Sequence, residues 1–141
     1  MARVSWSFLG RLTHEIAPNP ERRRVIFTRR VTAPLWTGPR QLLFNPKHGS
    51  LSDAMAMAKI AGTSAILGGT GVYDYFLEHR AIDEAEITVE PVTFGAGQSL
   101  FGARPWPKAL ASLGLDLISV ERLNARGTVL RRYAKSLSPA R

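Results

Sequence analysis

Two patterns of apolar and polar positions alternate along this chain. Short apolar runs, such as residues 25–28 and 65–67, are typical of buried strands. In residues 51–61 the apolar positions instead recur at helical spacing, at Leu51, Ala54, Met55 and Ala58. Because segments of the two kinds follow one another along the chain, the pattern predicts an α/β fold.

The same patterns locate the expected elements. Helices are expected from Gly10 to just before Pro18, from a cap at Ser50 or Ser52 through Ala61, and over residues 73–79. Loops or turns are expected at residues 34–39, 45–49, 94–98 and 124–127, with a proline-rich stretch at residues 104–107. Strands are expected over residues 3–9, 25–28, 41–44, 65–67, 82–92, 115–123 and 128–133. The last two strands would form an antiparallel hairpin across a four-residue turn.

A glycine cluster follows the apolar run at residues 65–67 and precedes a helical pattern. Gly68, Gly69 and Gly71 allow a tight turn, and the first N–H groups of the next helix would point toward an anion. The spacing differs from the G-x-G-x-x-G fingerprint, because no glycine lies three residues after Gly71. The motif therefore indicates either a phosphate cradle or a strand-to-helix turn that needs glycine only for positive φ.

Composition narrows the class of protein. The chain has 141 residues, of which 45% are hydrophobic and 21% charged, as expected for one globular domain. It contains no cysteine, which excludes disulfides, thiolate zinc sites and cysteine nucleophiles. His14, His48 and His79 lack metal-ligand spacing, so no metal is expected. No apolar run is long enough to span a bilayer, and the first residues lack a signal-peptide core, so we expect a cytoplasmic protein.

The net charge of +8 is unevenly distributed. Residues 1–47 carry +7, residues 48–121 carry −5, and residues 122–141 carry +6. If the two ends meet, they form one cationic face suited to a phosphorylated cofactor, a phosphorylated substrate or nucleic acid. The alternative is that Arg22–Arg23–Arg24 and Arg131–Arg132 are simply solvated surface runs.

Several short motifs, taken in order, resemble one known family. They are Phe-Thr-Arg-Arg at 27–30, Leu-Gly-Gly-Thr-Gly-Val-Tyr at 67–73, Ile-Asp-Glu-Ala-Glu-Ile-Thr-Val-Glu-Pro-Val at 82–92, Gly-Ala-Gly-Gln-Ser-Leu-Phe at 95–101 and Gly-Thr-Val-Leu-Arg-Arg-Tyr at 127–133. Over residues 8–134 the chain resembles the dihydrofolate reductase-like superfamily. Within it, the chain is most similar to the reductase domain of riboflavin biosynthesis, the C-terminal domain of the bifunctional deaminase-reductase.

The resemblance implies a dihydrofolate reductase-like α/β fold that binds NADPH, with a mostly parallel central sheet flanked by helices and an antiparallel C-terminal hairpin. The family's Gly-Arg-x-Thr segment, which contacts cofactor phosphates, matches Gly10, Arg11 and Thr13. The segment beside the adenosine 2′-phosphate matches Thr28, Arg29 and Arg30, and two guanidiniums suit a dianion. The family's paired glycines, often joined by a cis peptide bond, match Gly68 and Gly69. The resemblance further implies pyrophosphate contacts from the N–H groups of Thr70, Gly71 and Val72, and an aromatic side chain near the cofactor at Tyr73, for which helix-to-sheet packing is the alternative role.

The chain departs from the family pattern at its N-terminus. Relatives begin with a further strand and helix, which supply a central strand and an acidic residue that orients the substrate. The expected organisation is therefore one N-terminally shortened domain over residues 1–135 and a tail over residues 136–141, either because the real start lies upstream or because this is a degenerate copy. Asp74, Glu78, Asp83 and Glu84 are expected to be exposed, and no residue is assigned to catalysis.

The resemblance implies an NADPH-dependent reductase acting on a ribosylaminopyrimidine phosphate, with dihydrofolate as the second candidate substrate. A homodimer is common in the group. Two other classes of function stay open. One is a non-catalytic remnant that binds NADP or nothing. The other is nucleic-acid binding, which is disfavoured because the aromatic residues are not interleaved with the basic ones.

Overall fold

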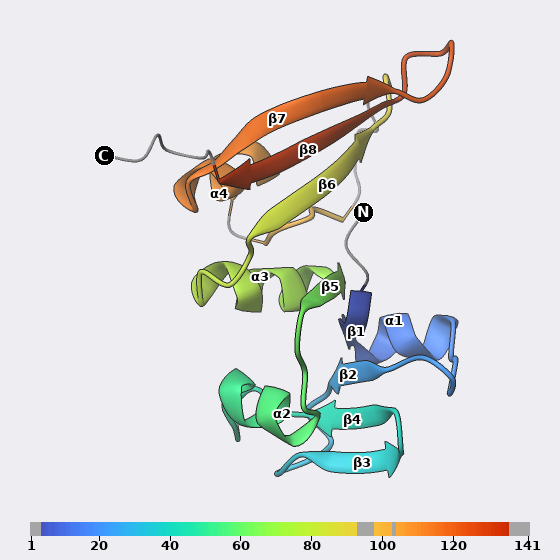
Figure 1. Cartoon of the computed structure of the whole chain (residues 1–141), viewed down its shortest axis with the longest axis vertical. Coiled ribbons are helices and arrows are strands. Elements are labelled where there is room, and N and C mark those ends of the chain that lie inside the picture. The colour runs from blue at the N-terminus through green and yellow to red at the C-terminus, as the bar shows by residue number, and fades with distance from the viewer. Residues whose placement is uncertain (1–3, 93–97, 103, 136–141) are drawn as a thin grey trace. The chain divides into compact units, whose positions relative to one another are not determined.

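A computed structural model of the chain describes residues 4–92, 98–102 and 104–135. The chain divides into two compact units, Met1–Tyr73 and Asp74–Arg141, here called the N-terminal and C-terminal units (Figure 1). The expected loop at residues 94–98, except Gln98, and the expected tail at residues 136–141 lie outside the described residues. A single domain over residues 1–135 stays a prediction.

The N-terminal unit contains a five-stranded, mostly parallel sheet. Its strand order is β3-β4-β2-β1-β5, and only the β3–β4 pair is antiparallel. The strands are β1 (Val4–Gly10), β2 (Arg24–Phe27), β3 (Leu35–Gly38), β4 (Gln41–Phe44) and β5 (Thr63–Gly68). The expected parallel sheet is thus confirmed for this unit, and the two strands richest in buried apolar residues, β1 and β2, lie inside it.

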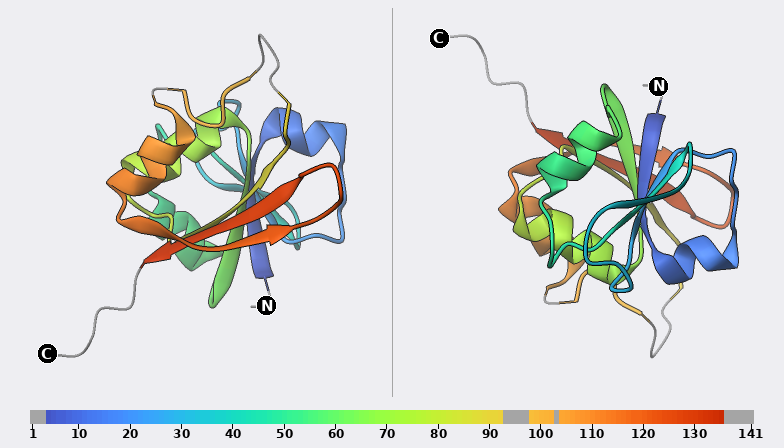
Figure 2. Two further views of the ribbon diagram at one scale, coloured as in Figure 1. Left: turned by 90° about the horizontal axis from the view of Figure 1, so that it is seen from above. Right: turned by 90° about the horizontal axis from the view of Figure 1, so that it is seen from below.

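Two short helices flank this sheet, α1 (Arg11–Ile16) and α2 (Leu51–Met57). They lie on opposite faces of the sheet (Figure 2). Ser50 caps α2, because its hydroxyl oxygen accepts a hydrogen bond from the Asp53 N–H at 3.1 Å. The helix ends four residues earlier than the expected Ala61, with Ala58 as the C-cap and Lys59 at a positive φ of 51°.

The core of the N-terminal unit comes from strands that are covered on both faces. Val25, Ile26, Leu42 and Phe44 are at most 1% exposed. Consecutive residues of β2 are buried, as expected for an inner strand of a parallel sheet. This packing holds the carboxyl ends of β1, β2 and β4 in register at one edge of the sheet.

One prediction for this unit was wrong. Residues 34–39 were expected to form a loop because prolines flank them, but Leu35–Gly38 form β3 and pair with β4. Both prolines lie just outside the strand, where a missing N–H costs no ladder hydrogen bond. The ring of Trp36 also packs edge-on against Trp6 at 6.2 Å between centroids.

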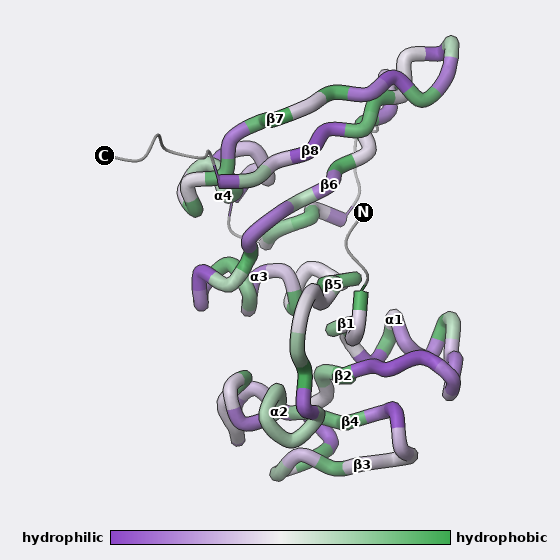
Figure 3. The backbone as a smooth tube through the Cα atoms, in the orientation of Figure 1, coloured by the Kyte–Doolittle hydropathy of each residue, from purple (hydrophilic) through white to green (hydrophobic). Residues whose placement is uncertain are grey.

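The C-terminal unit contains a three-stranded antiparallel sheet in the order β6-β8-β7. Its strands are β6 (Glu84–Val89), β7 (Leu115–Arg122) and β8 (Val129–Lys135), and the predicted hairpin between β7 and β8 is confirmed. Every second residue along β6 is partly buried, as expected for a strand with one face covered. Figure 3 colours the same strand by hydropathy. Helix α3 (Thr70–Glu78) runs from the first unit into the second.

Helix α4 (Trp106–Ser112) was not predicted, because the prolines around Trp106 indicated an irregular stretch. Pro105 is the N-cap and Pro107 lies in the first turn, where proline is tolerated because the first N–H groups have no partner within the helix. Ala109 and Leu110 bury the inner face of the helix. Trp106 packs edge-on against Tyr133 of β8, at 5.7 Å between ring centroids.

No helix in the described part of the chain is long and apolar enough to cross a membrane.

Candidate functional site

The strand ends of the N-terminal unit bring together three of the segments predicted from the sequence. Gly10 at the end of β1 is in register with Phe27, which directly precedes Thr28. On the other side of β1, Leu9 is in register with Gly68. A Cβ atom added to Gly10 would lie 3.8 Å from the Gly69 nitrogen and 3.9 Å from the Gly68 oxygen. The glycine loop therefore meets the start of α1 at the carboxyl edge of the sheet, where ligands of parallel α/β sheets bind.

The glycine loop begins with a cis peptide bond between Gly68 and Gly69, the feature that the family resemblance implied. Gly68 has a φ of +97°, and a Cβ atom there would lie 2.8 Å from Cε2 of Tyr73. Gly68 is therefore required by the fold itself. Tyr73 packs against the loop backbone, and its burial raises the pKa of its phenol above the ordinary value of 10.0. This contact is the packing role considered above as the alternative.

Gly69 and Gly71 differ from Gly68. Neither has a positive φ, and a Cβ atom added at either position would meet no atom within 4 Å among the described residues. Packing within the protein therefore gives no reason for glycine at these two positions. Close approach of a ligand to the backbone would give one, because a side chain would then fill the space that the ligand needs.

The N–H groups at the start of α3 are not all available to a ligand. The N–H groups of Val72 and Tyr73 donate to the Gly69 carbonyl oxygen at 3.1 and 3.0 Å. The Val72 N–H therefore already has an acceptor within the loop, and the expected pyrophosphate contact from it stays a prediction. In the described part of the chain, the Gly71 N–H has no backbone partner. Thr70 begins the helix.

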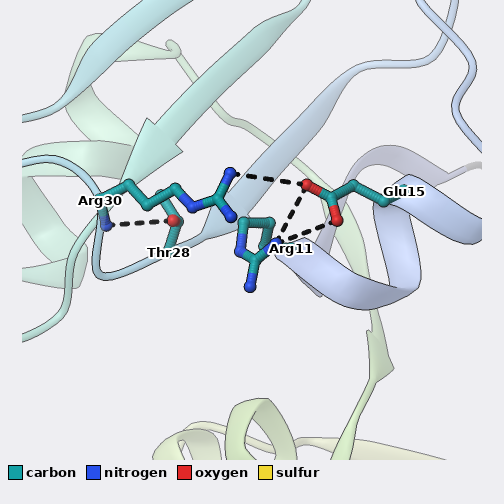
Figure 4. Close-up of polar contacts among 4 residues, drawn as sticks. All are labelled: Arg11, Glu15, Thr28 and Arg30. Carbon is teal, nitrogen blue, oxygen red and sulfur yellow. Dashed lines mark hydrogen bonds and ion pairs between the residues drawn. The ribbon is translucent and has the colours of Figure 1, made fainter.

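A cluster of three charged side chains lies beside the ends of β1 and β2 (Figure 4). One guanidinium nitrogen of Arg11 donates to both carboxylate oxygens of Glu15, at 3.1 and 3.0 Å. The Arg30 guanidinium approaches the same carboxylate at 3.9 Å. Glu15 therefore bridges two arginines that are nineteen positions apart in sequence, so both guanidiniums can reach one anion.

The neighbouring residues of the predicted phosphate segment also lie at this edge. Thr28 is 6% exposed, and its hydroxyl oxygen accepts a hydrogen bond from the Arg30 N–H at 3.2 Å. This bond fixes the turn after β2. Arg29 is exposed, and its side chain has no hydrogen bond or ion pair within the described ranges. Thr13 is half-buried on α1, whose N-cap Gly10 provides no side-chain hydrogen bond.

His14, also on α1, belongs to a separate contact. Its Nδ1 accepts a hydrogen bond from the Arg24 guanidinium at 3.0 Å, and Arg24 also donates to the Ala17 carbonyl oxygen. Burial, and secondarily the charge of Arg24, lower the pKa of His14 below the ordinary value of 6.5. His14 therefore acts as an acceptor that positions Arg24, while the charge of Glu15 partly offsets the lowering of its pKa.

Two hollows, of about 330 and 550 Å³, occur elsewhere. The smaller is formed by Arg122–Ala125 at the C-terminal hairpin, and the larger lies over β1 and β5 between Arg24 and Leu67. Neither contains a residue of the predicted site. No group of three or more histidine and acidic side chains in the described segments is arranged to hold a metal ion. The candidate site is thus defined by backbone and cationic groups at the sheet edge, rather than by an enclosed cavity.

Glu15 was not predicted to be a member of this site. The signal was available, because Arg11 and Glu15 are four residues apart on a segment predicted to be helical, and opposite charges at that spacing face each other. The proximity of Arg30 to Glu15 had no such signal, because it depends on the parallel pairing of β1 with β2.

Comparisons with known proteins establish the fold. No family model matches the chain, and no curated protein matches it. Among solved structures, the chain is similar to a protein from Shewanella sp. PV-4 described as a "putative riboflavin biosynthesis protein", with a TM-score of 0.69. The similarity covers 96% of this chain and 76% of the other at 23% sequence identity. The chain therefore has the mixed α/β fold of that protein.

Proposed function

We propose that a chain with this fold binds NADPH at the carboxyl edge of its parallel sheet and acts as a reductase of the riboflavin-biosynthesis type. The observation that carries the proposal is the pair of open positions at Gly69 and Gly71, in the loop that meets the start of α1, where Arg11 is the first helical residue. A backbone open to close approach beside solvent-accessible cationic groups is what binding of a phosphorylated ligand requires.

The residues present fit the phosphates of the cofactor. Arg29 and Arg30 supply guanidinium groups for the 2′-phosphate, in keeping with the family resemblance. Arg11, which shares the Glu15 carboxylate with Arg30, lies within reach of the same anion. Gly10 and the loop from Gly69 to Gly71 supply backbone that a pyrophosphate can approach, with the Gly71 N–H as a donor. NADPH, when bound, would supply the hydride. The chain's own contribution is to bind and orient the cofactor.

No side chain is assigned to proton transfer. Of the acids considered above, Asp74 has a structural role, because its two carboxylate oxygens accept the Gly102 N–H at 2.9 and 3.1 Å. Glu84 belongs to β6 and pairs in register with Ala134 at the end of the sheet. The proposal therefore rests on cofactor binding, and catalysis by this chain is a separate question.

The proposed substrate is a ribosylaminopyrimidine phosphate. The similarity in fold to a protein described as a "putative riboflavin biosynthesis protein" favours it. Dihydrofolate is the alternative substrate, and the alternative to an enzyme is a non-catalytic NADP-binding remnant. The homodimer that the family resemblance implies and the cytoplasmic location expected from the sequence belong to the same proposal.

The test is titration of NADPH fluorescence with the purified 141-residue chain, with NADH in parallel and thermal unfolding of the same sample. Micromolar binding that is selective for NADPH in a cooperatively folded chain would support the cofactor assignment. A cooperatively folded chain that binds neither nucleotide would refute it. If binding is found, oxidation of NADPH with each candidate substrate then separates an enzyme from a remnant.

A further inference from the structure

The carboxylate of Glu15 occupies the position between the two arginines where an anion would be bound. It accepts two hydrogen bonds from Arg11 and faces Arg30 at 3.9 Å (Figure 4). All three side chains are accessible, with exposed fractions of 32% for Arg11, 50% for Glu15 and 70% for Arg30. A ligand can therefore reach the guanidiniums, but only by replacing the carboxylate.

We propose that Glu15 is a specificity-determining residue that competes with the 2′-phosphate of the cofactor for Arg11 and Arg30. This inference rests on the proposed binding of NADPH. It assigns to Glu15 a role that the cofactor-binding motifs do not contain. The carboxylate holds the two arginines in place when no phosphate is present and weakens NADPH binding when one arrives.

The energies of the competing contacts favour exchange. Exposed ion pairs such as Arg11–Glu15 contribute little to stability, because both groups are well solvated. A phosphate carries close to two negative charges and accepts bidentate hydrogen bonds from guanidinium, so it binds arginine more strongly than a carboxylate does. Glu15 is therefore displaced rather than blocking the site outright.

The displaced carboxylate still affects the bound state. It remains on the same turn of α1 as Arg11, within a few ångströms of the phosphate, where two anions repel each other. NADH has no phosphate at this position and can leave the Glu15 bridge intact. Glu15 should therefore lower the affinity for NADPH but not the affinity for NADH. The preference of the chain for NADPH over NADH is then smaller than it would be without the Glu15 charge.

The test compares Glu15→Gln with the unchanged chain by titration with NADPH and with NADH. The variant removes the charge and keeps the shape and length of the side chain. We expect NADPH to bind about fivefold to tenfold more tightly, the effect of losing about 1 kcal/mol of competition and repulsion. NADH affinity should change less than about twofold.

The matched control is Glu21→Gln. Glu21 also forms an exposed ion pair with an arginine in the N-terminal unit, Arg40 at 2.6 Å, but outside the candidate site. The Glu21→Gln variant removes the same charge from the same unit. If it gained as much NADPH affinity as Glu15→Gln, the effect would come from net charge and the inference would be overturned. Unchanged or weaker NADPH binding in Glu15→Gln, with thermal unfolding unaltered, would also overturn it.

A second probe separates this inference from the proposed function. Adenosine 2′-monophosphate and adenosine 5′-monophosphate are titrated while the arginine Nε–Hε signals are followed by NMR. We expect only the 2′ isomer to shift the signals of Arg11 and Arg30, and to do so at lower concentration in Glu15→Gln. If the unchanged chain binds NADPH but the variant shows no gain with either ligand, only the role of Glu15 fails. If NADPH binds neither chain, the proposed function fails as well.

Discussion

The ring of Tyr73 lies against the backbone of Gly68, so close that a Cβ atom on Gly68 would be 2.8 Å from Cε2 of the tyrosine. The two residues lie on either side of the turn that joins β5 to α3. Their contact fixes the path of the backbone on which the candidate site is built, and it divides the glycines of the loop into two kinds.

Gly68→Ala is expected to destabilise the fold by about 1–3 kcal/mol, because the residue has a φ of +97° and no room for a methyl group. Gly69→Ala is the control, since its added methyl group meets nothing within 4 Å. Urea denaturation at equilibrium measures both. Equal stability of Gly68→Ala and the unchanged chain would show that the Tyr73 contact does not define the turn.

Gly69→Val is expected to leave folding intact and raise the dissociation constant for NADPH by at least about tenfold, which corresponds to about 1.4 kcal/mol. The reason is that the side chain fills space that is open in the protein and that the pyrophosphate would need. Arg22→Ala is the control for binding and should have little effect. Normal NADPH binding by Gly69→Val would mean that the glycine loop is only a turn.

The double variant Arg29→Ala/Arg30→Ala should bind NADPH about tenfold to a hundredfold more weakly than the unchanged chain. Its affinity for NADH should fall much less. Each hydrogen bond between a guanidinium and a phosphate contributes about 1.5–3 kcal/mol to binding. NADH lacks the 2′-phosphate, so it makes none of these hydrogen bonds and loses none in the variant. Fluorescence titration of both cofactors measures the ratio. An equal loss for NADPH and NADH would remove these arginines from the 2′-phosphate role.

How far the sequence alone predicts this structure depends on where the signal for each element lies. Strands β1, β2, β4 and β5 follow from local apolar runs, and the glycine loop follows from its composition. Strand β3 and helix α4 do not, because in both cases prolines at the boundary were interpreted as part of an irregular segment. Both elements depend on tertiary contacts. Trp36 of β3 pairs with β4, and Leu110 of α4 is buried in the C-terminal unit.

The candidate site shows the same limit. Gly10, Thr28 and Gly68 could be placed at one sheet edge once parallel strands were assumed, and their register confirms that they lie together. The use of the Val72 N–H by Gly69 could not be predicted, since it depends on how the loop enters α3. The same holds for Arg30 and Glu15, which meet only because β1 and β2 are neighbours.

Stability should fall as the pH falls below about 6.5, in part because of His14. Burial and Arg24 lower its pKa in the folded chain, so between that lowered pKa and about 6.5 the unfolded chain binds more protons than the folded one. His14 therefore contributes stability that is fully present above about pH 6.5 and is lost toward lower pH.

His14→Gln retains an acceptor for Arg24 but does not titrate. The difference in unfolding free energy between pH 7.5 and pH 5.5 should therefore be smaller in this variant than in the unchanged chain. Urea denaturation at the two pH values measures it. An identical difference in both proteins would show that His14 has the same pKa in the folded and unfolded states.

The strand order of the C-terminal unit affects how the chain folds during synthesis. Its central strand, β8, is also the last of its strands to be made, and both β6 and β7 pair with β8. The N-terminal unit has all five strands of its sheet by residue 68 and can fold while synthesis continues. The C-terminal sheet has no central partner until residue 135 has emerged. On a translating ribosome, β6 therefore lacks its partner strand while the nearly fifty residues between its own end and the end of β8 are made.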